Sequence, residues 1–295
     1  MHLGNGAITP ECAAITLGAA AVGLGAATSA LRRELPSREK LALAVGLGSL
    51  VFAAQAVNVP VLPGASAHLV GGVLLAWTLG PGLGAWTMVI ILAVQALLLG
   101  DGGLAALGAN IVNMALVPAG CIAACRQWKL DVGRLSHAAP VAAAVLSVPL
   151  AAMLIAGQTA LFRSGAELTG WQDFCARLIA THSWIGLLEG GCTLVAVVTL
   201  AWLRQSSHRP AAATFAVALA IAALALPWSS PLPDGYEAAL EAADLAAWLS
   251  GGSGAALDLA TRIGEQGAVL AGMLLVGLLT AALGVVAAGR RPLPA

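Results

Sequence analysis

Charged residues are scarce in this chain. They make up 9% of its 295 residues, whereas 59% are hydrophobic and the mean hydropathy is +0.90. Soluble domains contain about 25% charged residues, so this composition excludes an ordinary soluble protein. The apolar runs are close to the ~20 residues that cross a bilayer as a helix. We therefore expect an all-α, polytopic membrane protein in the inner (plasma) membrane.

Three further absences narrow the function. The formal net charge is zero, so no nucleic-acid partner is expected. Neither lysine, Lys40 nor Lys129, lies in a Gly-Lys-Ser/Thr sequence, so the chain has no Walker A motif and any ATP hydrolysis must come from another chain. No basic residue precedes the first apolar run, which is atypical of a cleaved signal peptide and predicts that the amino-terminal residues are retained.

The apolar segments predict about eight to nine transmembrane spans. They cover residues 12–31, 41–58, 69–80, 83–99, 104–124, 139–158, 179–203, 211–228 and 267–288. The third is short and ends at Gly80-Pro81-Gly82, so we expect a half-helix or a tilted segment. If the N-terminus is outside, 11 of the 14 basic residues fall in inside loops, as the positive-inside rule requires. This places the N-terminus and the 59–68 loop on the outer face.

The composition changes after residue 228. Residues 229–235 are rich in turn-forming types, and a mildly acidic amphipathic run follows from Glu237 to Leu249. We expect an external loop over 229–265 with a short surface helix, leading to one final span. Residues 211–295 are therefore interpreted as a module appended to a main domain of residues 1–210.

Met1 and His2 together form a possible metal chelate. The Met1 α-amine, the His2 amide nitrogen and the His2 imidazole Nδ1 can bind one ion in a single plane. Deprotonation of the amide favours ions with a strong planar ligand field, notably Ni(II) and Cu(II). The alternative is that His2 lies by accident in a frayed tail.

His68 lies in a glycine-rich stretch that the topology places on the same face. Imidazole is the commonest side-chain metal ligand, so His68 is a candidate for the remaining in-plane position. The alternative is a surface or capping residue at the mouth of a helix. Ligands must be deprotonated, so binding is expected to weaken as the pH falls toward the ordinary histidine pKa of about 6.5.

Polar residues near or within the spans form a second set of candidates. Asn58, Asn110 and Asn113 could brace the metal pocket, or could satisfy backbone groups and form hydrogen bonds between helices. His182 and Glu189 share one face of the seventh span, and an intramembrane carboxylate is a functional candidate by default. The alternative is a buried charge held by a partner such as His182 or by another subunit.

These motifs, taken in order, resemble the CbiM/NikM family. The family opens with Met-His-Ile-Pro-Asp-Gly, to which residues 1–6 are similar. The other matching blocks are Gln55–Pro60, Gly64–Gly72, Gly100–Met114 and His182–Glu189. The Pro-Asp-Gly-Tyr-Glu sequence at 233–237 resembles the Pro-Asp-Gly-Leu-Glu signature of a small auxiliary subunit, here fused to the main domain as in the NikMN arrangement.

The resemblance implies a function. CbiM/NikM proteins are the substrate-binding S components of energy-coupling factor transporters for cobalt and nickel. The ligands would be four nitrogens: the Met1 amine, the His2 amide, and the imidazoles of His2 and His68. Asn58, Ser66, Asn110 and Asn113 would lie around them. No cofactor is implied beyond the transported Ni(II) or Co(II).

The resemblance also implies partners within the lipid bilayer. These are a transmembrane T component, similar to CbiQ or NikQ, and two cytoplasmic ATPase subunits, similar to CbiO or NikO. Small residues of the first span (Ala19, Gly23, Ala26 and Ala27) could form the docking surface. The chain departs from the family at Gly4-Asn5, where a Pro-Asp pair is usual, so a carboxylate that could brace the N-terminal loop is missing.

Two alternatives belong to other classes. One is an intramembrane hydrolase that uses Ser183 or Ser66 with His182. The sequence contains no Gly-x-Ser-x-Gly elbow, and neighbouring residues on a helix do not face one another. The other is a scaffold subunit that binds no metal, for which a His2→Ala change would have no effect.

Overall fold

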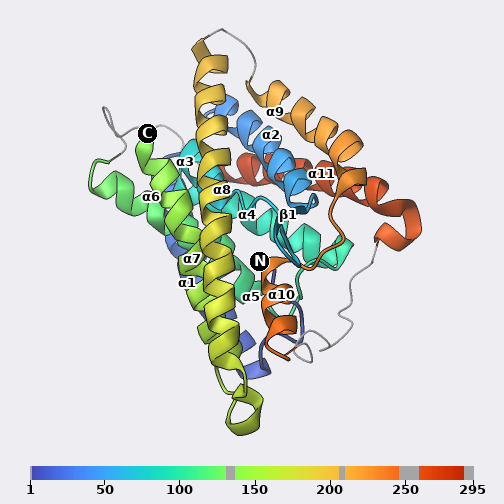
Figure 1. Ribbon diagram of the computed structural model, residues 1–295. Coiled ribbons are helices and arrows are strands. Elements are labelled where there is room, and N and C mark those ends of the chain that lie inside the picture. The colour runs from blue at the N-terminus through green and yellow to red at the C-terminus, as the bar shows by residue number, and fades with distance from the viewer. Residues whose placement is uncertain (1, 131–136, 206–209, 246–258, 289–295) are drawn as a thin grey trace.

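The computed structural model describes residues 2–130, 137–205, 210–245 and 259–288, which are predominantly helical (Figure 1). The α-helices are α1 (Pro10–Arg33), α2 (Arg38–Gln55), α3 (Gly72–Leu79), α4 (Pro81–Val94), α5 (Leu107–Asn110), α6 (Val117–Gln127), α7 (Ala138–Ala160), α8 (Trp171–Gln205), α9 (Pro210–Ala220), α10 (Gly235–Ala242) and α11 (Leu259–Ala288). Short π-helical turns are η1 (Gln95–Leu99), η2 (Ile111–Leu116) and η5 (Ile221–Ala225), and short 3₁₀ turns are η4 (Gly165–Leu168) and η6 (Leu226–Trp228).

Local sequence explains where the first helices begin and end. The Thr9 side chain accepts a hydrogen bond from the Cys12 amide, which caps α1, and Pro10 occupies its first turn. Ser37 caps α2 in the same way by accepting from the Lys40 amide. The half-helix α3 lies between Gly71 and Gly80, both at positive φ, a conformation that glycine adopts without strain.

The helices pack closely through small residues, as expected in lipid. The long helix α8 runs the height of the molecule beside α7 (Figure 1). Gly186 and Gly190 of α8 lie against α7, where an added Cβ would collide with the Val145 backbone or side chain. Helix α2 contacts α9 and α11, and Gly272 of α11 packs on the Phe52 ring. The last two spans are thus packed against the first domain, while the domain boundary at 210 stays a prediction.

The membrane architecture is confirmed. Among the residues that the structure describes, seven helical segments are long and apolar enough to cross a membrane, and α1 is the least buried of them. The third segment is the short helix that was expected, with α3 ending at Leu79. Helix α2 has 18 residues and carries Arg38, Glu39 and Lys40 in its first turn, so it is not among the seven. The chain is a multi-pass helical membrane protein.

Loops assigned to the same side of the membrane meet in space. The amide of Gly103 donates to the Leu3 carbonyl at 2.8 Å, and the Ser230 amide donates to the Asn58 carbonyl at 2.8 Å. At the other end, Arg126 lies 3.8 Å from Glu34 in an ion pair. The alternation of loops is therefore as predicted, and the outside location of the N-terminus stays a prediction.

Two local predictions were wrong. Residues 59–67, expected as a loop, form an antiparallel hairpin of β1 (Val59–Leu62) and β2 (Ala65–Ala67), with Val59 opposite Ala67. The helix expected on the surface near 237–249 begins at Gly235, and Tyr236 and Leu240 are fully buried. Tyr236 packs edge-on against Phe174 of α8, with ring centroids 6.0 Å apart. Because one face of α10 is apolar, it packs on α8 instead of lying free.

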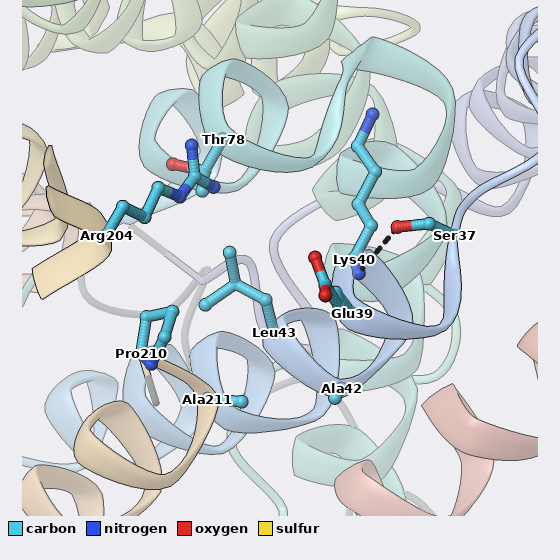
Figure 2. A pocket seen from close by; sticks show the side chains of 9 residues that line it. All are labelled: Ser37, Glu39, Lys40, Ala42, Leu43, Thr78, Arg204, Pro210 and Ala211. Carbon is cyan, nitrogen blue, oxygen red and sulfur yellow. Dashed lines mark hydrogen bonds between the residues drawn. The ribbon is translucent and has the colours of Figure 1, made fainter. Parts of the chain in front are cut away.

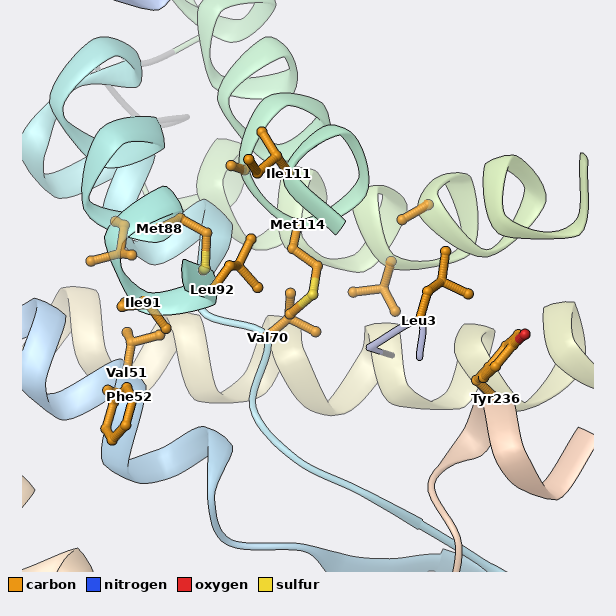
Figure 3. Close-up of a cluster of buried hydrophobic side chains, with 14 of the residues drawn as sticks. Leu3, Val51, Phe52, Val70, Met88, Ile91, Leu92, Ile111, Met114 and Tyr236 are labelled. Carbon is orange, nitrogen blue, oxygen red and sulfur yellow. The ribbon is translucent and has the colours of Figure 1, made fainter. Parts of the chain in front are cut away.

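A continuous apolar core joins these elements. Figure 3 shows Leu3 near Met114 and Val70, between helices that come from distant parts of the chain. Leu3 is fully buried although it lies in the N-terminal segment. Burying a leucine side chain contributes about 1.5–3 kcal/mol, so this residue anchors the N-terminal segment in the bundle.

Candidate metal centre

The N-terminal segment is held by hydrogen bonds to the start of the fifth span. The Asn110 side chain accepts from the Leu3 amide at 2.9 Å and donates to the Leu3 carbonyl at 3.1 Å. Asn110 is itself buried, and the Gly103 amide donates to the same carbonyl. Both backbone polar groups of Leu3 are therefore satisfied, which fixes the residue next to His2.

Asn5 fills a bracing position in this segment. Its side-chain oxygen accepts a hydrogen bond from the Ala105 amide at 3.0 Å. Gly103 lies so close to Asn5 that an added Cβ would collide with the Asn5 backbone and side chain. Arg163 donates to the carbonyls of Gly6 and Ala7. The Asn5 side-chain oxygen thus accepts a hydrogen bond from the 100–106 loop. The carboxylate that is usual at this position in the family could accept the same hydrogen bond.

The structure brings His2 and His68 together. Their rings stack with centroids 5.1 Å apart and an interplanar angle of 25°. His2 Nδ1 lies 3.3 Å from Asp101 Oδ1, and His2 Nε2 is buried without a hydrogen-bond partner in the part of the chain that the structure describes. Met1, the third predicted ligand residue, lies outside the described residues.

Both imidazoles are neutral at physiological pH. Burial lowers the pKa of His2 to about 3, and the Asp234 carboxylate and the Gln95 side chain offset only part of this effect. Burial lowers the pKa of His68 to about 4, an effect that His2 increases and Asp101 opposes. A neutral imidazole has a free lone pair, which metal ligation requires.

Hydrogen bonding selects the free nitrogen of His68. Its Nδ1 lies 3.0 Å from the Leu69 carbonyl oxygen. Because a carbonyl can only accept, Nδ1 carries the proton in the neutral ring and Nε2 carries the lone pair. Such a contact to a backbone carbonyl is typical of metal-binding histidines, where it fixes the ring orientation.

The 229–237 segment packs on the hairpin that carries His68. The Ser66 amide and hydroxyl donate to the carbonyls of Pro233 and Leu232, at 2.8 and 2.7 Å. Asn58 makes backbone hydrogen bonds to Ser229 and Ser230, while its buried side-chain oxygen has no partner among the described residues. Ser66 and Asn58 therefore position the hairpin and do not hydrogen-bond to either imidazole.

Helix α10 begins next to this hairpin. The Asp234 side chain accepts from the Tyr236 and Glu237 amides, and the Glu237 side chain accepts from the Asp234 amide, which makes a capping box. Gly235 packs tightly against α8, because an added Cβ would lie 3.0 Å from Thr181 Cγ2 and 3.2 Å from His182 Cε1. In Figure 1, α10 and β1 gather beside α8.

A chain of buried amides runs from the His68 loop toward His2. The Gln55 Nε2 group donates to the Val70 carbonyl at 2.7 Å, and its Oε1 accepts from Gln95 Nε2 at 2.8 Å. The Gln95 side-chain oxygen takes no part in this pair, and the Gln95 side chain raises the pKa of His2. Gln95 begins the π-helical turn η1, a feature often found at functional sites. The sequence alone does not indicate Gln95, Asp101 and Asp234 as residues of the site, because only the fold brings them near the histidines.

The intramembrane pair is arranged differently from the sequence-based alternative. Glu189 accepts from the amides of Val70 and Gly71, at 2.9 and 2.6 Å. His182 Nδ1 donates to the Leu178 carbonyl at 2.8 Å, and its Nε2 is buried without a partner among the described residues. His182 is therefore not the hydrogen-bond partner of the Glu189 carboxylate.

Asn113 lies outside this group of contacts. Its side chain exchanges hydrogen bonds with Gln158 of α7, at 2.8 and 3.2 Å. Within the described ranges, no three His, Cys, Asp or Glu side chains cluster to hold a metal. A site built from side chains alone is therefore not formed there, and backbone nitrogens would have to contribute.

Neither serine of the hydrolase alternative is paired with His182. The Ser183 hydroxyl is exposed and donates to the Ile179 carbonyl at 2.7 Å. The Ser66 hydroxyl donates to backbone carbonyls, as described above. A nucleophile needs a base within hydrogen-bond reach, and these geometries do not supply one.

A large cleft lies at the opposite end of the molecule. It has a volume of about 730 Å³ and lies between α2, α3, α8 and α9. Figure 2 shows Lys40, Glu39 and Arg204 around it, with Thr78 on one wall. It includes none of the histidines and is separate from the candidate metal centre.

Fold and site together define a multi-pass membrane protein in which two neutral histidines, the buried His2 and the half-buried His68, meet at one end of its bundle. Residues 2–207 match the CbiM family, described as a cobalt uptake substrate-specific transmembrane region. The chain belongs to this family.

Known proteins are similar over much of the chain. A protein of Archaeoglobus fulgidus, provisionally named a fused nickel transport protein, NikMN, is 34% identical over 190 residues, 63% of this chain and 62% of that protein. A protein of Haloquadratum walsbyi, provisionally named a cobalt transport protein, CbiM, is 32% identical over 64% of this chain and 89% of its own length. The match spans only 36–62% of the length of three such relatives.

A solved structure supports the fold. The crystal structure of a truncated transition metal transporter aligns with 70% of this chain and all of its own, with a TM-score of 0.58 and 27% sequence identity.

Proposed function

We propose that this chain is the substrate-binding S component of an energy-coupling factor importer for Ni(II) or Co(II). The metal would be bound by the Met1 amine, the His2 amide nitrogen, His2 Nδ1 and the His68 imidazole on the outer face. The observation that carries the proposal is the stacked pair of neutral imidazoles, the buried His2 next to the amino terminus and the half-buried His68. Membership of a family described by cobalt uptake supports it.

The spacing of the rings suits one ion. Two imidazoles on one metal have centroids roughly 4.5–6.5 Å apart, given metal–nitrogen bonds of about 2.0–2.1 Å. The observed 5.1 Å lies in this range. The chelate requires His2 Nδ1, which here faces Asp101, so a bound cation would replace that contact and lie beside the carboxylate.

The surrounding charges favour a cation with one deprotonated amide. Such a complex of a divalent ion carries one net positive charge, and a buried charge needs a compensating partner. The carboxylates of Asp234 and Asp101 supply negative charge here, since Asp234 raises the pKa of His2 and Asp101 raises that of His68. An all-nitrogen planar set favours Ni(II) over Co(II). Affinity order alone would favour Cu(II), so selectivity would come from availability or from transport steps.

The proposal also assigns partners. A transmembrane T component and two cytoplasmic ATPase subunits would drive reorientation of the loaded chain, because the chain itself lacks a Walker A motif. The exposed face of α1 is a suitable docking surface, because an added Cβ at Gly18 or Gly25 meets nothing within 4 Å. Of the four residues suggested by the sequence, Gly23 and Ala27 instead pack inside the chain, against Leu116 and near Gly82.

Cellular uptake of radioactive nickel and cobalt tests this function. Cells would express the chain with or without a T component and the two ATPases. We expect uptake only with the complete set, and its loss in His2→Ala and His68→Ala variants. His137→Ala is the matched control, because His137 is an exposed histidine at the start of α7. Unchanged uptake in His2→Ala would support the scaffold alternative instead.

A further inference from the structure

The buried carboxylate of Glu189 has an unusual environment for a membrane-spanning helix. It is 3% exposed and lies on α8. Its hydrogen-bond partners in the described part of the chain are the amides of Val70 and Gly71, and both carboxylate oxygens are used. A carboxylate is costly in this setting unless it is well compensated, so the arrangement needs a reason beyond packing.

The two amides immediately follow the His68 loop and precede α3. Val70 is two residues after His68, and Gly71 is the N-terminal capping residue of α3. A carboxylate near the amino end of a helix is also stabilised by the helix dipole. At the other end of α3, Arg126 donates to the Trp77 carbonyl at 3.5 Å. The amino end of α3 is thus held by an acidic side chain, Glu189, and its carboxyl end by a basic one, Arg126, each opposite in charge to that end of the helix dipole.

The backbone at this point has little freedom. Gly71 has a φ of 73°, and an added Cβ would collide with Val51. The Val70 peptide groups are held from two sides, because the amide donates to Glu189 and the carbonyl accepts from Gln55. Gln55 accepts in turn from Gln95, whose side chain raises the pKa of His2. Hydrogen bonds therefore link Glu189 through the Val70 peptide groups to Gln55 and Gln95, and Gln95 lies beside His2.

We propose that Glu189 is a positioning residue for the metal: its carboxylate holds the Val70 and Gly71 amides and thereby fixes the imidazole of His68 as the fourth ligand. This rests on the proposed metal site. Glu189 does not touch the ion; it reduces the freedom of the loop that delivers His68. Loss of the carboxylate leaves the amino-terminal chelate of Met1 and His2 intact, but the His68 imidazole is no longer held in place as the fourth ligand.

The test is nickel binding to the purified full-length chain, read by the visible ligand-field spectrum and by titration. In Glu189→Gln the shape is kept, but one amide oxygen cannot replace two carboxylate oxygens. We expect nickel to stay bound with a Kd raised about 10- to 100-fold, as for groups that orient metal ligands. The spectrum should move toward that of His68→Ala, and added free imidazole should restore the wild-type spectrum in both.

Control variants separate positioning from a loss of stability. Thr193→Val changes another buried polar residue of α8. A change that only lowers stability does not alter the ligands of the metal, so this variant should leave the spectrum of bound nickel unchanged. Glu189→Asp keeps the charge and should give an intermediate Kd, which preserves the test if Glu189→Gln does not fold. Exchange of the Val70 and Gly71 amide hydrogens should speed up in the Glu189 variants and not in Thr193→Val.

The outcomes distinguish the two proposals. A wild-type chain that binds no nickel through a planar nitrogen site overturns the proposed function itself. A wild-type chain that does bind it, with Glu189→Gln unchanged in Kd and spectrum, overturns the role of Glu189 alone. A Glu189→Gln variant with a lower melting temperature but a wild-type nickel spectrum also overturns it.

Discussion

The imidazoles of His2 and His68 lie stacked 5.1 Å apart at an interplanar angle of 25°, although one belongs to the amino terminus and the other follows a hairpin after the second helix. Each is kept in place by a different set of contacts. Asn110 holds Leu3, the residue next to His2, while the Leu69 carbonyl accepts from His68 and Glu189 holds the Val70 amide. A metal bound between the rings would join these two sets.

Asn110 and Asn113 provide a matched pair of variants. Asn110→Ala removes two hydrogen bonds to Leu3 and should raise the Kd for Ni(II) about 10- to 100-fold, because the chelating segment loses its support. Asn113→Ala breaks only the pair with Gln158 and should cost about 0.6 kcal/mol of stability, a typical value for a hydrogen bond between membrane helices. Titration and thermal unfolding measure the two effects. Equal changes in Kd would contradict the distinct roles.

The pH dependence of binding should reflect the amine and amide rather than the imidazoles. Metal binding displaces protons, so affinity rises with pH. The two imidazoles, with pKa values near 3 and 4, are already neutral at pH 5. The α-amine has an ordinary pKa of about 7.7–8.0. The logarithm of the apparent association constant should therefore rise about two units per pH unit between about pH 5 and 7.

This revises the expectation drawn from the sequence, which placed the loss of binding near the ordinary histidine pKa. A slope that steepens toward about four below pH 6 would mean that the imidazoles titrate near their usual value of about 6.5. A flat affinity from about pH 8 to 5.5 would rule out ligation by the amine and amide, since protons would not compete. Isothermal titration over this range decides between them.

The exposed face of α1 should mediate assembly with the T component. Gly25→Leu adds a side chain where nothing lies within 4 Å, so the chain should still fold and bind nickel. Co-purification of the T component should fall at least about five-fold, which corresponds to about 1 kcal/mol of interface energy. Gly191→Leu, at an exposed glycine of α8, is the control. Equal losses in both variants would show that α1 has no special role.

Ser183→Ala tests the hydrolase alternative. Because the Ser183 hydroxyl is exposed and donates to the Ile179 carbonyl, whereas His182 is buried, its loss should leave nickel uptake within about two-fold of wild type, as for most exposed substitutions. A strong loss of uptake with normal protein levels would contradict the assignment of Ser183 as a residue without a chemical role.

The sequence predicted the spans well because hydrophobic length is a strong signal. It missed the hairpin at 59–67, whose strands are short and whose first strand contains Pro60. It also treated residues 235–242 as surface, because apolar spacing shows that one face is buried but not against what. The partners of Glu189 were missed for a related reason: backbone amides leave no mark in a sequence, so only the nearest titratable residue, His182, could be suggested.

Among the predicted site residues, the sequence indicated Met1, His2 and His68 from their chemistry and the family pattern. The structure places His2 beside His68, and Asn110 at the N-terminal segment. Asp101, Asp234 and Gln95 could not be assigned, since they are distant in sequence and come together through a glycine loop, a capped helix and a π-helical turn.

The most direct test of the account is the nickel content of the purified protein when three residues are added before Met1. The added residues move the α-amine away from the chelate but leave His2, His68 and their contacts unchanged. A single added residue would not serve, because it would make the histidine the third residue, where the amine, two amide nitrogens and the imidazole also bind Ni(II) in one plane. We predict one equivalent of nickel in the wild type and in a variant extended at the carboxyl end, and loss of nickel in the amino-terminally extended variant. Full nickel content in the extended variant would contradict the amino-terminal chelate and direct the search to His182 and Glu189.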